Sequence, residues 1–130
     1  MTGNSGADGG GIAVFYGAYG NGLRMARTTI SDNTATARGG GIYVDGDIDL
    51  YSPRVNNSTI TGNSATTGGG IHDDSGQLEL RNATVTGNTA STQVGGVFFG
   101  SNPEETLESN IIAENTATNA GPDRSLPFRT

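Results

Sequence analysis

The feature that most constrains this chain is a degenerate internal repeat. The word Gly-Gly-Gly-Ile occurs at residues 9–12, 39–42 and 68–71, and a shorter Gly-Gly-Val occurs at 95–97. The aliphatic residue that closes the word recurs at spacings of 30, 29 and 26 residues. Self-similarity at such a period predicts stacked structural units that bury a core only together.

Two further words follow the glycine word, in the same order in each copy. A Thr/Ser-rich word ends in an aliphatic residue, and three residues later comes an asparagine followed by Ser or Thr and then Ala. The aliphatic residues are Ile30, Ile60, Val85 and Ile112. The asparagines are Asn33, Asn63, Asn88 and Asn115, with Asn4 as a partial fifth copy.

Between the glycine word and the Thr-Ile word lies an alternating stretch. It reads Leu23-Arg-Met25, Ile48-Asp-Leu50 and Leu78-Glu-Leu80, with a weaker version around Leu107. Alternation with a period of two predicts a strand with one face buried. Each repeat is therefore predicted to hold three short strands, separated by turns of Gly, Asn, Asp and Ser.

These strands predict an all-β fold, a right-handed parallel β-helix of about four coils of three short strands, as a single domain over residues 1–130. Each strand would pair with its equivalent one coil away, at about 4.8 Å. The predicted inward columns are Ile12/Ile42/Ile71/Val97, Leu23/Ile48/Leu78, Met25/Leu50/Leu80/Leu107 and Ile30/Ile60/Val85/Ile112.

The composition fits this thin core. Few large aliphatic residues and a net charge of −6 are typical of disordered chains. A disordered chain does not place its aliphatic residues in register, however, and a solenoid core is a narrow column that needs few of them.

Composition also excludes several function classes. There is no Cys, so disulfides and thiolate metal sites are excluded. Seven basic residues against 13 acidic ones argue against binding to nucleic acid or anionic lipid. No run of 18 apolar residues is present, so direct membrane insertion is not expected.

The repeated words are best explained by structural roles. Asparagine tolerates left-handed turns, and identical stacking of Asn33, Asn63, Asn88 and Asn115 predicts an amide ladder. The glycines are interpreted as turn residues with positive φ, because a phosphate-binding loop would need a Lys or a helix start.

With these words in place, the chain resembles the right-handed β-helix repeats of bacterial surface and secreted proteins. The resemblance is to polymorphic outer-membrane protein repeats, and to choice-of-anchor proteins with a pectate-lyase-like helix. Residues 109–123 look like the last coil of the latter group, and residues 119–130 are predicted to form a C-terminal cap.

The resemblance implies an exported or cell-surface bacterial protein, although no secretory signal is visible in this chain. The first repeat begins partway through, so the chain is expected to be a fragment or the C-terminal end of a longer solenoid. It implies a non-enzymatic module for adhesion or structural display. Its partners would be a carbohydrate or a host or cell-surface protein, and end-to-end self-association is expected at uncovered strand edges.

The alternative is a remnant of a carbohydrate-active enzyme of the polysaccharide lyase or hydrolase type. Its candidate site is Asp45, His72, Asp73 and Asp74, which would stack near one another and could bind carbohydrate or Ca²⁺. The competing interpretation is an acidic turn after an exposed strand. No complete catalytic motif is present, so no catalytic residue, resident metal or cofactor is assigned.

A lesser alternative is ice binding by a flat array of hydroxyls. Its candidates are Thr29, Thr59, Thr61, Thr84 and Thr86. Threonine is also simply a good strand residue, and the fourth copy places Ile111 and Ala113 where the array would continue.

Overall fold

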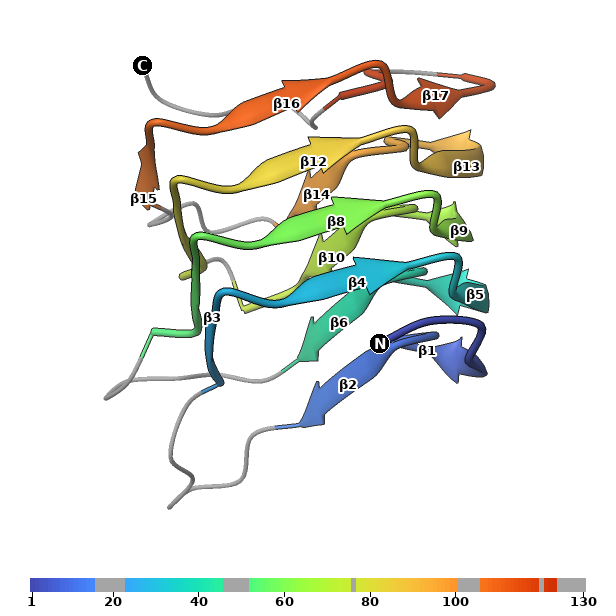
Figure 1. Cartoon of the computed structure of the whole chain (residues 1–130). Coiled ribbons are helices and arrows are strands. Elements are labelled where there is room, and N and C mark those ends of the chain that lie inside the picture. The colour runs from blue at the N-terminus through green and yellow to red at the C-terminus, as the bar shows by residue number, and fades with distance from the viewer. Residues whose placement is uncertain (16–22, 46–51, 76, 101–105, 120, 124–130) are drawn as a thin grey trace.

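The structure, a computed structural model, describes residues 1–15, 23–45, 52–75, 77–100, 106–119 and 121–123. Coils of chain stack on one another from the N-terminal to the C-terminal end, and equivalent strands of successive coils lie side by side (Figure 1). All strand pairs within the described residues are parallel, and together they form four sheets. The predicted all-β parallel β-helix is confirmed.

Each of the four sheets takes its name from the residues that recur in its strands. The Thr-Ala sheet contains β1 (Ser5–Asp8), β5 (Thr34–Arg38), β9 (Ser64–Thr67), β13 (Thr89–Gln93) and β17 (Thr116–Ala117). The Gly-word sheet contains β2 (Ile12–Phe15), β6 (Ile42–Asp45), β10 (Ile71–Asp73) and β14 (Val97–Phe99). The Arg sheet contains β3 (Arg24–Ala26), β7 (Arg54–Asn56), β11 (Glu79–Arg81) and β15 (Thr106–Glu108). The Thr-Ile sheet contains β4 (Thr29–Ser31), β8 (Thr59–Thr61), β12 (Thr84–Thr86) and β16 (Ile111–Ala113).

The core consists of inward columns that run through the stack. Two of the predicted columns are confirmed in full: Ile12/Ile42/Ile71/Val97 on the Gly-word sheet and Ile30/Ile60/Val85/Ile112 on the Thr-Ile sheet. Most members of these columns are fully buried. Removing them from water is the main favourable term that holds the coils together.

The number of strands per coil was predicted wrongly, because each coil has four strands and not three. The additional strands form the Thr-Ala sheet, directly after each ladder asparagine. The inward residues of its three central strands are Ala35, Ala65 and Ala90, all buried.

In each of the other two predicted columns, the residue assigned to the second coil is wrong. Val55 lies between Met25 and Leu80, in the position predicted for Leu50. Likewise Pro53, and not Ile48, lies in line with Leu23 and Leu78, as the bonds from Arg54 N to Leu23 O and from Glu79 N to Pro53 O show. Ile48 and Leu50 lie outside the described residues.

In the three complete glycine words, the first two glycines have different structural roles. The first is in the left-handed region, with φ of 67° at Gly9 and 65° at Gly39. The second lies so close to the next coil that a Cβ on Gly40 would overlap the carbonyl oxygens of Gly69 and Ser64. The word is therefore a tight corner, and its second position admits only glycine.

The C-terminal edge of β14 is covered by the chain itself. Gly96 N and Val97 N donate to the carbonyls of Pro122 and Asp123, at 2.8 Å each. The rest of the predicted 119–130 cap, from residue 124 on, lies outside the described residues. The described part of the chain holds no helix with the length and apolarity of a membrane span.

Candidate functional site

The predicted asparagine ladder is confirmed, and it is buried. Asn33 donates from both its backbone N and its Nδ2 to Asn63 Oδ1, at 2.9 and 3.0 Å. Asn63 bonds Asn88 in the same way, and Asn88 bonds Asn115. Each rung thus satisfies buried polar groups of the coil before it.

The ladder extends beyond the four predicted rungs at both ends. Asn4 donates to Asn33 Oδ1 from N and Nδ2, at 2.9 and 3.0 Å. At the other end Asn115 donates from N and Nδ2 to Asp123 Oδ1, at 3.1 and 3.0 Å. A carboxylate therefore takes the place of the last amide. The ladder is a structural element, since its polar atoms bind one another.

The candidate acidic site lies on the outer face of the Gly-word sheet. His72 is paired in register with Tyr43 on one side and with Phe98 on the other, as predicted. Asp74 follows directly after β10. Its Oδ1 lies 2.9 Å from His72 Nε2, and its Oδ2 accepts a hydrogen bond of 3.2 Å from the Tyr43 hydroxyl.

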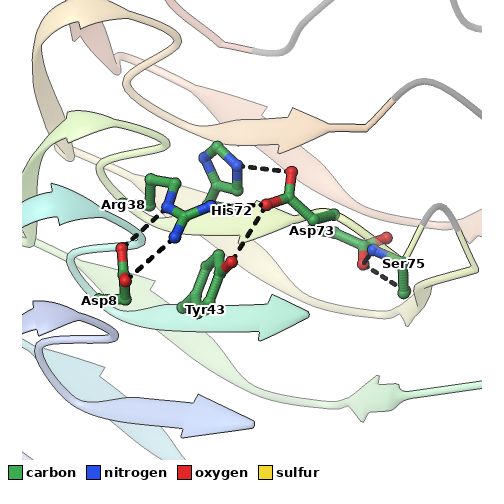
Figure 2. Close-up of polar contacts among 7 residues, drawn as sticks. Asp8, Arg38, Tyr43, His72, Asp73 and Ser75 are labelled. Atoms are coloured by element: carbon green, nitrogen blue, oxygen red, sulfur yellow. Dashed lines mark hydrogen bonds and ion pairs between the residues drawn. The ribbon is translucent and has the colours of Figure 1, made fainter. Parts of the chain in front are cut away.

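Arg38 joins this group from the end of β5. Its guanidinium binds Asp8 through Nε and Nη2, at 2.9 and 3.1 Å, and reaches Asp74 Oδ2 through Nη1 at 3.1 Å. It also lies over the Tyr43 ring, 4.5 Å from the centroid. Figure 2 shows Arg38 between Asp8 and the Tyr43–His72 pair, so charges from three coils meet here.

The electrostatics of this cluster follow from burial and pairing. Burial lowers the pKa of His72 below its ordinary 6.5, although Asp74 opposes the shift. The hydrogen bond from Arg38 lowers the pKa of Asp8. Burial, reinforced by the Asp74 charge, raises the pKa of the Tyr43 hydroxyl. The His72 side chain is only 5% exposed, and protonation at Nε2 fits its contact with Asp74, because a carboxylate oxygen accepts.

Asp73 does not join the cluster. It is fully buried and turned away, as expected for neighbours on a strand, and Figure 2 shows it directed at Ser75. Its Oδ1 accepts from Ser75 N and Ser75 Oγ, and its Oδ2 accepts from Leu78 N at 3.1 Å. Asp73 therefore holds the turn that leads toward β11.

Asp45 is the remaining member of the candidate site. It ends β6 and pairs in register with Phe15, and its charge contributes to the raised pKa of Tyr43. Among the described residues, no three His, Asp or Glu side chains are arranged to hold a metal ion. The structure thus brings His72 and Asp74 together and separates Asp73 from them.

Aromatic rings extend the cluster along the same face. The ring of His72 stacks on Phe98 with centroids 4.3 Å apart, and it lies 5.6 Å from Tyr43. Phe15 continues the row at 5.7 Å from Tyr43 and is 66% exposed. Phe99, by contrast, packs into the core.

The threonine candidates stack in two ranks on the Thr-Ile sheet. Thr29, Thr59 and Thr84 form one rank, and Ser31, Thr61 and Thr86 form the other. The fourth coil interrupts both, with Ile111 beside Thr84 and Ala113 beside Thr86. Ice binding by this face stays a prediction.

Sequence reasoning missed Arg38, Asp8 and Asp123. Asp8 and Arg38 both precede a glycine word, and their register partnership could have been found from that position. Opposite charges at equivalent positions of adjacent coils are the signal. Asp123 had no such signal, because it lies outside the repeat words.

Comparison with known proteins agrees with the geometry. A family model described as a right-handed β-helix region matches residues 1–121. The comparisons with curated proteins and with solved structures return no significant match.

Proposed function

The chain belongs to the right-handed β-helix family, and on that premise we propose that it is a non-enzymatic module of an exported or cell-surface bacterial protein. Its role is adhesion or structural display. The stacked coils hold an outer surface at fixed spacing, and partners would bind to that surface. The family alone does not decide this, because one scaffold can carry many activities.

The observation that carries the proposal is that the candidate catalytic groups bind one another. Asp74 accepts from Arg38 and also contacts His72 and Tyr43. A general acid needs a transferable proton, and a general base a free lone pair, within hydrogen-bond reach of the substrate. The buried His72 ring, with Nε2 engaged by Asp74, is better suited to holding adjacent coils in register.

A second candidate is favoured by one specific observation. The 2.9 Å contact between His72 Nε2 and Asp74 Oδ1 resembles the acid–base pairs of hydrolytic sites. In this reading the chain is a remnant of a carbohydrate-active enzyme, and Asp74 would orient the imidazole.

Activity and stability, measured on the same variant, distinguish the display role from the enzymatic role. The purified chain is incubated with acidic and neutral polysaccharides, with and without Ca²⁺, and released reducing ends and unsaturated uronates are measured. For the display role we expect no turnover by the wild type. Asp74→Asn should then lower the free energy of unfolding by about 1–2 kcal/mol. Turnover that Asp74→Asn abolishes, in a variant that still folds, would favour the enzyme.

Adhesion is tested separately, by binding of the labelled chain to intact cells and to immobilised glycans. Fractionation of the source cells tests the location. Saturable binding and recovery from the surface fraction are expected, whereas recovery only from the interior would contradict the proposal.

A further inference from the structure

The corner between the Arg sheet and the Thr-Ile sheet has an exposed residue at the same position in every coil. These residues are Arg27, Asn57, Asn82 and Ser109. Each directly follows the last residue of a strand of the Arg sheet, and those last residues are register partners of one another. Figure 1 shows the corners, which join β3 to β4, β7 to β8, β11 to β12 and β15 to β16, stacked in one row.

The backbone of this corner is left-handed in each coil. The φ angles of the four residues lie between 49° and 54°. Asparagine tolerates this conformation better than most side chains do. The corner does not require asparagine, however, because Arg27 and Ser109 adopt the same conformation. The turn therefore favours Asn57 and Asn82 without fully explaining them.

Asn57 and Asn82 each begin an Asn-x-Thr triplet. The triplets are Asn57-Ser58-Thr59 and Asn82-Ala83-Thr84. An Asn-x-Ser/Thr triplet without a central proline is the acceptor sequence for N-linked glycosylation. In both triplets the asparagine is exposed in the turn, and the threonine is the partly exposed first residue of the next strand. The residue after each threonine faces the core, so the threonine itself faces outward with the asparagine.

A third triplet, Asn56-Asn57-Ser58, overlaps the first but is closed by the fold. Asn56 Oδ1 is buried, and Ser58 is only 4% exposed. The Ser58 hydroxyl donates to Asn56 O at 2.8 Å and accepts from Thr28 N at 3.2 Å. The four buried ladder asparagines do not qualify either, because Ala follows each of them two residues later. Asn57 and Asn82 thus combine the acceptor triplet with exposure.

We propose that this corner is a site of N-linked glycosylation, with Asn57 and Asn82 as acceptors. The donor is a sugar joined through C1 to phosphate, as in nucleotide sugars and lipid-linked sugars. Asparagine Nδ2 attacks C1, so an Nδ2–C1 bond forms and the C1–O bond to phosphate breaks. The phosphate leaves with the bonding electrons, and Nδ2 releases one proton to a base of the transferase.

The folded chain can itself be the substrate of this transfer. Both acceptor side chains lie on the surface, and the hydrophobic core beneath the corner is not disturbed when they are extended. The site lies away from His72 and Asp74, on a different side of the coil. The inference therefore does not depend on the proposed display role.

The test is mass spectrometry of the full chain purified from its source cells. Because the chain has no Lys, trypsin places Asn57 in the peptide 55–81 and Asn82 in the peptide 82–124. Electron-transfer fragmentation leaves a sugar on its asparagine and so distinguishes Asn56 from Asn57. A hexose or N-acetylhexosamine on Asn57 or Asn82 is expected. Unmodified peptides, or a sugar on Asn56 or a ladder asparagine instead, would overturn the proposal.

Variants made in the same cells test the triplet itself. Thr59→Val combined with Thr84→Val removes both acceptor hydroxyls but keeps β-branched strand residues, and it should abolish the modification. Thr61→Val combined with Thr86→Val is the matched control, two residues further along the same strands on the same face, and it should keep the sugar. A sugar retained in the first double variant, or lost in the control, would refute the assignment.

Far-ultraviolet circular dichroism of both double variants should match that of the wild type. If the first variant does not fold, Asn57→Gln combined with Asn82→Gln replaces it, because both side chains are exposed. Loss of the sugar from this variant supports the site, and its retention refutes it. Unmodified chain is then mixed separately with the soluble and the membrane fraction of the source cells. Transfer by the soluble fraction identifies a nucleotide sugar as donor, and transfer by the membrane fraction identifies a lipid-linked sugar; either result supports the site.

Discussion

Single polar residues in this protein are fixed by partners one coil away. Asn63 lies between Asn33 and Asn88, and Arg38 lies between Asp8 and Asp74. The side-chain oxygens of the asparagine ladder accept from the equivalent position of the adjacent coil. The energetic weight of such a residue is therefore set by what its removal leaves unpaired.

The ladder can be tested at a central rung. Asn63→Ala removes the acceptor of two donors on Asn33 and the donor to Ile30 O. We expect the free energy of unfolding to fall by about 3 kcal/mol or more, measured by urea denaturation. Asn119→Ala, at an exposed position, is the control and should cost less than about 0.5 kcal/mol. Similar losses in the two variants would contradict a structural ladder.

His72 gives the stability a dependence on pH. Its folded pKa lies below the ordinary 6.5, so the unfolded chain takes up a proton more readily than the folded one. Stability should therefore be full above about pH 7.5, fall as the pH drops through about 6.5, and level off below the folded pKa. Melting temperatures across this range measure the effect.

His72→Phe is the variant that isolates this effect, because it keeps a ring between Tyr43 and Phe98 and removes the titrating group. The melting temperature of this variant should not change with pH over the same range. Asp8 affects stability over a separate, more acidic pH range. Its pKa is lowered by the hydrogen bond from Arg38, so its contribution is lost only as the pH falls below its ordinary 3.8. An unchanged slope in His72→Phe would assign the effect elsewhere.

At the scale of the element, the corner made by each glycine word sets the shape of a coil. One glycine turns the chain with a positive φ, and the next lets two coils approach at backbone distance. In the fourth coil Val94 takes the first position with a φ of 55°, which is a strained conformation for a β-branched residue. Glycine at the second position of each corner is thus a geometric requirement, because a Cβ there would overlap backbone atoms of the next coil.

A substitution in the corner separates these roles. Gly40→Ala would place a Cβ against backbone atoms of Gly69 and Ser64, which cannot move without shifting a coil. We expect a loss of several kcal/mol or failure to fold, monitored by circular dichroism. Gly6→Ala is the control, because its Cβ would meet nothing closer than 3.3 Å, and it should change stability by less than about 1 kcal/mol. A mild effect at Gly40 would show that the corner is looser than described.

The elements that sequence could predict were those with a large inward side chain. The Gly-word and Thr-Ile strands were predicted in the correct register because each carries an Ile or Val. The Thr-Ala strands were missed because their inward residue is alanine, and a short Thr-Ala segment next to Asn is hard to distinguish from a turn.

The misplaced column has a different cause. Ile48-Asp-Leu50 alternates like a strand, but Val55 lies five residues before Ile60, as Met25 lies before Ile30 and Leu80 before Val85. Constant spacing to the next word decides the register, and alternation alone does not.

In the candidate site, the pairing of His72 with Tyr43 followed from register. The link to Arg38 depends on side-chain reach, which alternation does not give.

At the scale of the whole molecule, each coil contacts mainly the coils next to it. Nine strands, those numbered β5 to β13, have a partner on both sides, while β1–β4 and β14–β17 have one strand partner each. In such a quasi-one-dimensional stack, stability is close to a sum of coil and interface contributions.

This arrangement predicts a gradient of local stability along the stack. Backbone amides of the two-sided strands should exchange with deuterium at least about tenfold more slowly than those of β1–β4 and β16–β17. The amides of Gly96 and Val97 should be protected despite their position, because they donate to Pro122 and Asp123. Uniform protection over all strands would indicate a single cooperative unit and contradict the additive description.

The ladder also has a polarity. In every rung the amide oxygen accepts from the coil before it, and the backbone N–H and Nδ2 donate to the amide of the coil after it. Nδ2 also donates to a backbone carbonyl of the coil before, as Asn63 does to Ile30 O, but the side-chain amides still point the same way through the stack. The donating end of this row meets the carboxylate of Asp123, as an anion meets the N-terminus of a helix. An ionised carboxylate accepts hydrogen bonds but has none to give. Asp123 therefore ends the row of amides. An amide at this position could donate to a further rung, whereas an ionised carboxylate cannot.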